Sequence, residues 1–323
     1  MKVILLGNRG SRPIGASEGS PFAKYGGDTT CIGVTFDDGT IVSLDAGSGF
    51  WKWPYTLKTL MGREAPFDMH LLLSHFHLDH TMGLAQSEFL FGKDNTISIY
   101  GPDFAPGLKR VFEDSANKPF NPDLAKLYAA KISFNTLADT DTHKSFELPN
   151  GAKVSYLFVP HGDEESIGYR IDHEGQSLVV ISDTHHIFDK DDKPVLSKDI
   201  IEFIDGANMM IYDSHFSDKE LNDSPFLRTF GHSTGEHGVR LCAAGGVPMF
   251  ISHHHNPAND DRTLDAMSRD LRFYGYDNNV FVVPAMPSLT IDLAKHPQEI
   301  LKDLSEQDSP EKRWQFIAGR SPK

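Results

Sequence analysis

Short runs of aliphatic and β-branched residues recur along the chain and are separated by polar segments. Runs of this length and composition are typical of buried β-strands. They predict strands at residues 3–6, 31–36, 41–44, 69–73, 97–100, 154–159, 177–181, 209–212, 249–251, 280–283 and 289–291.

Amphipathic periodicity predicts a smaller number of helices. The expected helices cover residues 81–89, 104–114, 123–130, 199–204, 234–243 and 261–274. Helices are scarcer in the first half of the chain, where the predicted strands follow one another in adjacent pairs. This order favours two β-sheets packed face to face with helices on the outside.

The length of 323 residues is enough to bury a large core, in one large α/β domain or in two small ones. No apolar run approaches the roughly 18 residues that a membrane-spanning helix needs. Residues 1–7 carry too short an apolar run for a signal peptide, so the cytoplasm is the expected compartment. The two cysteines, Cys31 and Cys242, lie too far apart in the sequence to indicate a disulfide framework.

The net charge of −14 comes from 45 acidic against 31 basic residues. Proteins that follow a polynucleotide backbone usually present a basic stripe, because neutralised phosphates release counterions. No cluster of Lys and Arg longer than two residues occurs here. The charge therefore argues against long nucleic acid as a partner, while a small phosphorylated substrate remains compatible with it.

A dense group of histidines follows the strand predicted at 69–73, in the sequence Ser74-His75-Phe76-His77-Leu78-Asp79-His80. Imidazole nitrogen and carboxylate oxygen are ligands that suit zinc and its neighbours in the first transition row. Extended backbone points His75 and His77 the same way. Asp79 and His80 follow where the chain turns, so they can face a second ion. A solvated, His-rich loop is the alternative, but the ligand order after a buried strand favours a metal motif.

Four further polar clusters follow predicted strands or open a predicted helix. They are Val159-Pro160-His161-Gly162, Ile181-Ser182-Asp183-Thr184, Gly231-His232-Ser233-Thr234 and His253-His254-His255. Alone, each is compatible with an ordinary loop, a helix cap or a polar surface. Together with the first motif, they supply the remaining ligands of a site for two metal ions.

With these motifs in this order, the chain resembles the metallo-β-lactamase fold superfamily from Gly7 to about Leu293. It is most similar to the phosphodiesterase branch, which includes ribonuclease Z and small-molecule cyclic phosphodiesterases. The finer resemblance is carried by Gly7-x-Arg9-Gly10-Ser11 with Tyr25-Gly26-Gly27-Asp28-Thr29-Thr30-Cys31, by Gly168-Tyr169-Arg170-Ile171, and by Gly231-His232-Ser233-Thr234.

The resemblance implies an α/β fold built as an αββα four-layer sandwich. We expect the hydrolase domain at residues 1–295, with residues 86–142 as a wall or lid beside the site. A C-terminal extension, residues 296–323, follows it. There are two alternatives for how this extension packs: against a second copy of the chain in a homodimer, or against its own domain.

The resemblance also assigns roles to single residues. The first ion would be held by His75, His77 and His161, the second by Asp79, His80 and a late histidine, and Asp183 would bridge both. His253, His254 and His255 all compete for the late position. The family's spacing, with the ligand three residues before a proline-like position, selects His254 because of Pro257. The implied cofactors are two divalent ions, with zinc favoured and manganese or iron as alternatives.

Two such ions can lower the pKa of a shared water and polarise a phosphodiester. Asp79 would orient the attacking nucleophile as well as bind metal, and His232 would protonate the leaving oxygen. Asp213 would hydrogen-bond His232. The alternatives are a helix-start residue for His232 and a plain strand end for Asp213.

These features predict a phosphodiesterase for a small cyclic or nucleotide-like diester. The alternatives are a lactone or thioester hydrolase of the same fold, and a metabolite-sensing binding protein that uses the same pocket. Processing of tRNA needs a basic arm to grip RNA, and the sequence contains no Gly-rich and Lys/Arg-rich insertion of that kind.

Overall fold

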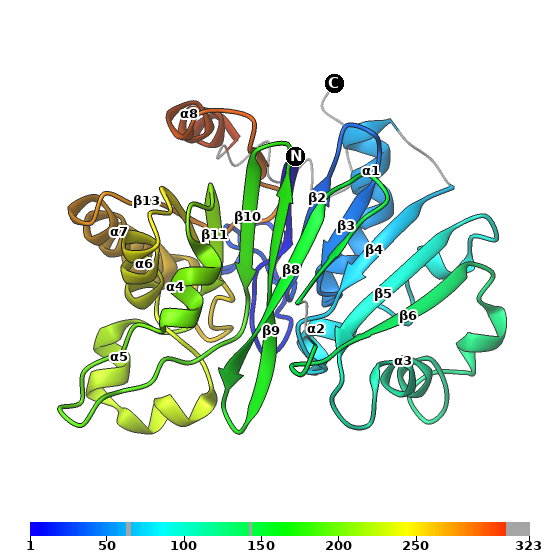
Figure 1. Ribbon diagram of the computed structural model, residues 1–323, viewed down its shortest axis with the longest axis horizontal. Coiled ribbons are helices and arrows are strands. Elements are labelled where there is room, and N and C mark those ends of the chain that lie inside the picture. Colours follow the sequence, from blue (N-terminus) through cyan, green and yellow to red (C-terminus); the bar gives the residue numbers. More distant parts are fainter. Residues whose placement is uncertain (63–65, 142–143, 308–323) are drawn as a thin grey trace.

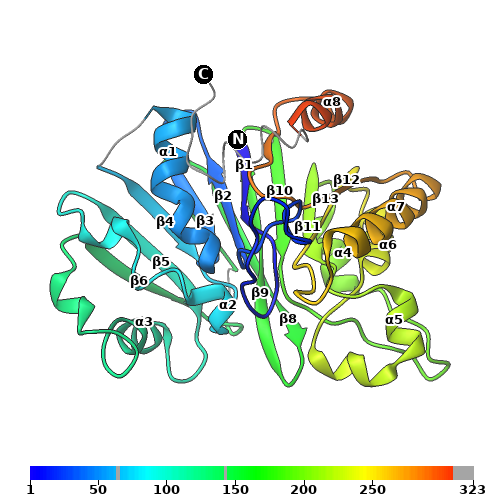
Figure 2. The ribbon, with the colours of Figure 1, turned by 180° about the vertical axis from the view of Figure 1, so that it is seen from behind.

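Two β-sheets face each other in the centre of the molecule, and helices cover both outer faces (Figure 1). The computed structural model describes residues 1–62, 66–141 and 144–307. Seen from behind, the same four layers are apparent (Figure 2). Helix α1 (Trp53–Met61) lies outside one sheet, and α4 (Lys198–Ile204), α6 (Gly235–Ala244) and α7 (Asp261–Asp277) lie outside the other. The expected αββα sandwich is therefore confirmed.

Each sheet has seven strands. The first sheet has the order β14–β1–β2–β3–β4–β5–β6, with β1 at Lys2–Gly7, β2 at Cys31–Thr35, β3 at Ile41–Leu44, β4 at Asp68–Leu72, β5 at Thr96–Pro102, β6 at Lys131–Leu137 and β14 at Thr290–Asp292. The second has the order β13–β12–β11–β10–β9–β8–β7, with β7 at Ser145–Glu147, β8 at Lys153–His161, β9 at Glu164–His173, β10 at Gln176–Ile181, β11 at Met209–Asp213, β12 at Met249–His253 and β13 at Phe281–Pro284.

Side chains alternate between two apolar layers along the central strands, as the two-residue period of a strand requires. In β1, Val3 and Leu5 face the core between the sheets, whereas Ile4 joins the cluster under α1. In β10, Val180 faces the central core and Val179 faces the cluster under α4, α6 and α7. Three apolar layers therefore hold four structural layers together, and burial of this apolar surface is the main stabilising contribution.

Four helices, those that begin at Lys198, Asp218, Gly235 and Asp261, are preceded by a side chain that accepts a free N–H group of the first turn. The Thr234 hydroxyl accepts the N–H of His237 at the start of α6, and the Asp260 carboxylate accepts the N–H of Thr263 at the start of α7. The α-helices are α1 Trp53–Met61, α2 Leu78–Thr81, α3 Leu108–Ala116, α4 Lys198–Ile204, α5 Asp218–Asp223, α6 Gly235–Ala244, α7 Asp261–Asp277 and α8 Pro297–Gln307. Single 3₁₀ turns are η1 Ser48–Lys52, η2 Glu88–Phe91, η3 Leu124–Leu127 and η4 Pro225–Phe230.

Strand direction collects the functional loops. Within the first sheet β1, β3 and β4 run the same way, and within the second β8, β10, β11 and β12 do so. Their carboxyl ends meet at one edge of the sandwich, where ligands bind in many α/β proteins. The polar clusters expected from the sequence follow these strand ends.

Two predicted helices are wrong. At 81–89 the helix stops after Thr81, because the N–H of Gly83 donates to the carbonyl of Ala46 instead of continuing the turn. At 123–130 only the short η3 forms, and the N–H groups of Ala129 and Ala130 donate to the carbonyl of Leu90. In both places a tertiary hydrogen bond outweighs a weak helical preference.

The segment predicted as a wall or lid, 86–142, contributes β5 and β6 to the first sheet and carries α3 on its outer side (Figure 1). In the predicted C-terminal extension, Ile300 and Leu304 of α8 join the central core. The domain boundary at 295 and the lid role remain predictions, and residues 308–323 lie outside the described residues. Among the described helices, none combines the length and apolar character that a bilayer crossing requires.

Candidate active site

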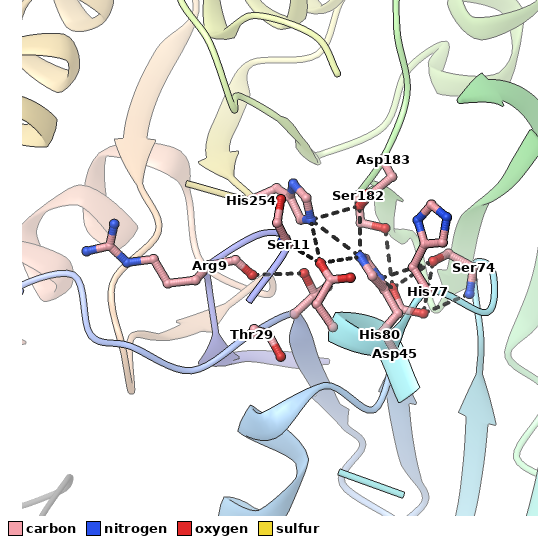
Figure 3. Close-up of polar contacts among 12 residues, drawn as sticks. Arg9, Ser11, Thr29, Asp45, Ser74, His77, His80, Ser182, Asp183 and His254 are labelled. Atoms are coloured by element: carbon pink, nitrogen blue, oxygen red, sulfur yellow. Dashed lines mark hydrogen bonds and ion pairs between the residues drawn. The ribbon is translucent and has the colours of Figure 1, made fainter. Parts of the chain in front are cut away.

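Seven side chains with metal-binding groups converge at the carboxyl edge of the two sheets, beside two further histidines, His215 and His232, whose ring nitrogens lie near the same donor atoms. Figure 3 shows His77, His80, Asp183 and His254 of the seven. The seven come from the loop after β4, the end of β8, the residues after β10 and the residues after β12. These are the seven side chains expected from the sequence, namely His75, His77, Asp79, His80, His161, Asp183 and His254. Six of them are buried, and His77 is exposed at the opening.

The first group of donor atoms is formed by His75, His77, His161 and one oxygen of Asp183. His161 Nε2 lies 3.3 Å from His77 Nδ1 and 3.6 Å from Asp183 Oδ2. His75 Nε2 lies 3.9 Å from the same Asp183 oxygen. Three imidazoles and a carboxylate at these separations surround one common point.

The second group is formed by Asp79, His80, His254 and the other oxygen of Asp183. His80 Nε2 and His254 Nε2 lie 3.1 and 3.2 Å from Asp183 Oδ1. Asp79 Oδ2 is 3.3 Å from each of these two nitrogens. Asp183 thus presents one oxygen to each group, as a bridging ligand does.

The protonation pattern of these groups fits a pair of cations. His80 Nδ1 donates to Asp45 Oδ2 at 2.8 Å and His161 Nδ1 donates to the carbonyl of Gly231 at 2.7 Å, which leaves Nε2 of each ring as the atom that can face a metal ion. The Nε2 atoms of His80 and His254 lie 3.3 Å apart, and among the described residues buried His75 Nε2 has no hydrogen-bond partner. Metal-ligating histidines usually donate their other N–H as His80 and His161 do.

The carboxylates are charged, as metal binding requires. Burial opposes ionisation of Asp79 and Asp183, but the histidines around them outweigh burial and hold the pKa of both carboxyls below the usual range. The residues present therefore fit two divalent ions.

The side chains of the three consecutive histidines, His253, His254 and His255, have different environments. His253 Nε2 donates to the carbonyl of Gly7 and His255 Nε2 to that of Ala285, both at 2.9 Å. His254 alone reaches the donor cluster, in a left-handed backbone conformation with φ 59°. The tight turn after β12 is what turns this side chain toward the site.

His232 and Asp213 form a pair beside the first donor group. His232 Nδ1 donates to Asp213 Oδ2 at 2.9 Å, and the N–H of Thr184 donates to the same carboxylate at 3.2 Å. Burial lowers the pKa of His232, but Asp213 outweighs it together with Asp183 and Asp79, and the pKa rises to about 9. Bound cations would offset the charges of Asp79 and Asp183, and Asp213 would then be the carboxylate paired with His232.

A family model described as the beta-lactamase superfamily domain matches residues 43–255, which is more than half of the chain. The chain belongs to this superfamily. The expected membership is confirmed, and with it the expectation of a hydrolytic enzyme. No curated protein has a matching sequence.

Solved structures of superfamily proteins share the fold at low identity. Zinc-bound PqqB from Methylobacterium extorquens has 18% identity and a TM-score of 0.63, over 91% of this chain and 100% of that one. A diphosphatase of the PhnP family has 17% identity and a TM-score of 0.61, over 90% and 97%. The short form of human tRNase Z has 15% identity and a TM-score of 0.61, over 91% and 99%.

Two residues that support the site, Asp45 and Ser11, were given no role from the sequence. Asp45 accepts from the N–H of Ser74 at 2.7 Å and from His80, and so fixes the histidine motif. Ser11 donates its N–H to Asp79 Oδ2 at 2.6 Å. Asp45 and Ser11 both have positive φ, 60° and 59°. Strained backbone of this kind often marks functional sites, but the sequence gives no sign of it.

A further histidine, His215, lies against this site and was not expected. Its Nδ1 donates to the carbonyl of His254 at 3.1 Å, and its ring stacks on that of His232. Burial, with repulsion from His232 and His254, lowers the pKa of His215 well below its ordinary value. The Ser-His pair after β11 was the available signal, because it stands directly after Asp213.

Proposed function

We propose that the protein is a dinuclear metal-dependent phosphodiesterase that acts on a small cyclic or nucleotide-like diester. The observation that carries the proposal is the position of an Asp213-held histidine, His232, beside two donor groups that share Asp183. A site that only binds a metabolite needs no proton donor. A phosphodiesterase needs one for the leaving oxygen.

When bound, two divalent ions supply Lewis-acid activation of a phosphodiester and of the attacking water. Zinc is the proposed metal, since five of the seven ligands are imidazoles, and manganese or iron are the alternatives for this donor set. The zinc in the PqqB structure supports this choice.

Side chains of the protein orient the nucleophile and protonate the leaving oxygen. Asp79, whose carboxylate also receives the N–H of Ser11, orients the nucleophile. His232 gives its Nε2 proton to the leaving oxygen as the ester bond breaks. Asp213 stabilises the charged imidazole before transfer and holds its Nδ1 proton, so that only Nε2 can donate.

Two relatives named for phosphorus chemistry, a diphosphatase and a tRNase, support a phosphodiester over a lactone or thioester. The acidic charge and the lack of a basic arm in the sequence favour the small substrate over RNA.

The test is a hydrolysis screen with metal-loaded protein. The substrates are 2′,3′- and 3′,5′-cyclic nucleotides, phosphoribosyl cyclic phosphate, lactones, thioesters and a precursor tRNA. We expect cleavage of at least one small diester and none in the Asp183→Ala variant. Turnover of acyl substrates alone would contradict the proposal, and efficient cleavage of precursor tRNA would restore the RNA-processing alternative.

A further inference from the structure

The proton donor of the proposed reaction is held by one hydrogen bond and by the rings around it. Among the described residues, the hydrogen bond from Nδ1 to Asp213 holds the polar edge of His232. That bond fixes a distance, whereas the tilt of the imidazole depends on its ring contacts, of which the one with His215 is the shortest and most nearly parallel. Proton transfer needs a fixed direction as well, because a misplacement of about 1 Å can cost about 10²-fold in rate.

His215 supplies a flat surface for this ring. The two ring centroids lie 4.3 Å apart and the planes differ by 14°, which makes a parallel stack. His215 is only 5% exposed, so it has little freedom to move away.

His215 is itself held at two points that belong to the site. Its Nδ1 donates to the carbonyl of His254 at 3.1 Å, and its backbone N–H donates to Asp213 Oδ1 at 3.0 Å. The same residue therefore touches the proton donor, the partner of the donor and the turn that carries a metal-binding side chain.

We propose that His215 is a positioning residue that aims His232 through the stacked contact of their rings. This inference rests on the proposed function, because it concerns the step that His232 performs there. The backbone bond to Asp213 survives any side-chain change. The bond from Nδ1 to the carbonyl of His254 is lost in both His215→Ala and His215→Phe, so the comparison of these two variants isolates the ring contact.

The kinetic test uses zinc-loaded protein and two diesters, one with an alkyl leaving group and one with p-nitrophenolate, which barely needs a proton. His215→Ala should slow the alkyl ester by about 10- to 10²-fold and change the p-nitrophenyl ester little, with both metals retained. His215→Phe keeps the stacked surface and should stay within a few-fold of wild type. His173→Ala, at the far end of β9, is the matched control for loss of a histidine.

A double variant shows whether His215 acts through His232. In the His232→Ala background, His215→Ala should cause no further loss on the alkyl ester, because the group that it positions is gone. A further loss of the same size, equal slowing of both esters, or loss of metal in His215→Ala would overturn the proposal.

A readout without substrate separates this inference from the proposed function. Zinc-loaded wild type should show a downfield proton signal for His232 Nδ1–H, identified by its disappearance in His232→Ala. His215→Ala should shift or broaden this signal, and His215→Phe should preserve it. An unchanged signal in His215→Ala would refute the positioning role, whereas failure to cleave any diester would refute the proposed function alone.

Discussion

A single methyl group at Gly10 should remove one of the two metal ions. Gly10 lies directly against the imidazole of His254, and a Cβ built on it would stand 2.3 Å from Cε1 and 2.8 Å from Nε2. Gly10 does not have the positive φ that favours glycine, so alanine adopts its backbone without strain. The change therefore acts on the side chain of His254 alone.

The size of the effect follows from the contact. Ordinary van der Waals contact of a Cβ begins at 3.4 Å, so the His254 ring has to withdraw by about 1 Å. Among the described residues the Nδ1 of His254 has no hydrogen-bond partner, so no bond at this nitrogen resists the displacement of the ring. We expect an overpacking cost of about 1–3 kcal/mol in stability and a rate loss of about 10²-fold or more.

The assay is elemental analysis of Gly10→Ala after metal loading and gel filtration, combined with diester hydrolysis. Wild type should carry about two ions per chain and Gly10→Ala about one, since the first donor group does not include His254. Gly15→Ala is the matched control, because it lies in the same loop and its Cβ would meet nothing within 4 Å. Two ions and a wild-type rate in Gly10→Ala would refute the assignment of His254 as a ligand.

Three further substitutions test the bridging carboxylate, the proton donor and a buried histidine outside the site. Asp183→Ala should retain at most one ion and little activity, because both donor groups lose an oxygen; retention of two ions on elemental analysis would argue against a bridging role. His232→Ala should retain both ions and slow an alkyl diester by about 10²–10⁴-fold, and a normal rate would exclude it as the acid. His70→Leu should raise the free energy of unfolding by about 1–2 kcal/mol near pH 7.5, because both buried ring nitrogens of His70 lack a hydrogen-bond partner within the described part of the chain. Burial lowers the pKa of His70 below its ordinary 6.5, so the unfolded chain alone takes up this proton in acid. Denaturant unfolding should therefore show the advantage of His70→Leu growing as the pH falls from about 7.5 to 5.5, and a constant or reversed difference would contradict this.

Much of the fold and the donor set could be predicted, because the signals are local. A run of aliphatic residues followed by His75, His77, Asp79 and His80 predicts both a buried strand and a metal-binding motif within a few positions. The strand ends at His161 and Asp183 carry the same kind of signal. The spacing to Pro257 selected His254, and the structure brings that side chain, and neither neighbour, to the cluster.

One strand that escaped prediction has a sequence with little strand preference of its own. Strand β9 begins with two glutamates and includes Gly168, which is a poor strand sequence, yet it pairs with β8 and β10 in the middle of the second sheet. The two-residue turn at Gly162, between paired His161 and Glu164, was a usable hairpin signal.

Functional residues were missed because their roles depend on tertiary contacts. Asp45 accepts a hydrogen bond from His80, which lies 35 positions away in the sequence. His215 contacts His232 through stacked ring faces, and no sequence spacing predicts such a contact. Contacts of this kind are made by the turns at the sheet edge, so they become visible only when the strands are assembled.

The central claim is that two ions act together on a small phosphodiester. Its most direct test is a titration of metal-free protein with zinc or manganese while hydrolysis of a small diester is measured. We expect the rate of diester hydrolysis to stay low through the first equivalent of metal and to reach its plateau at about two equivalents per chain. A full rate at one equivalent, or no hydrolysis at any loading, would contradict the dinuclear phosphodiesterase.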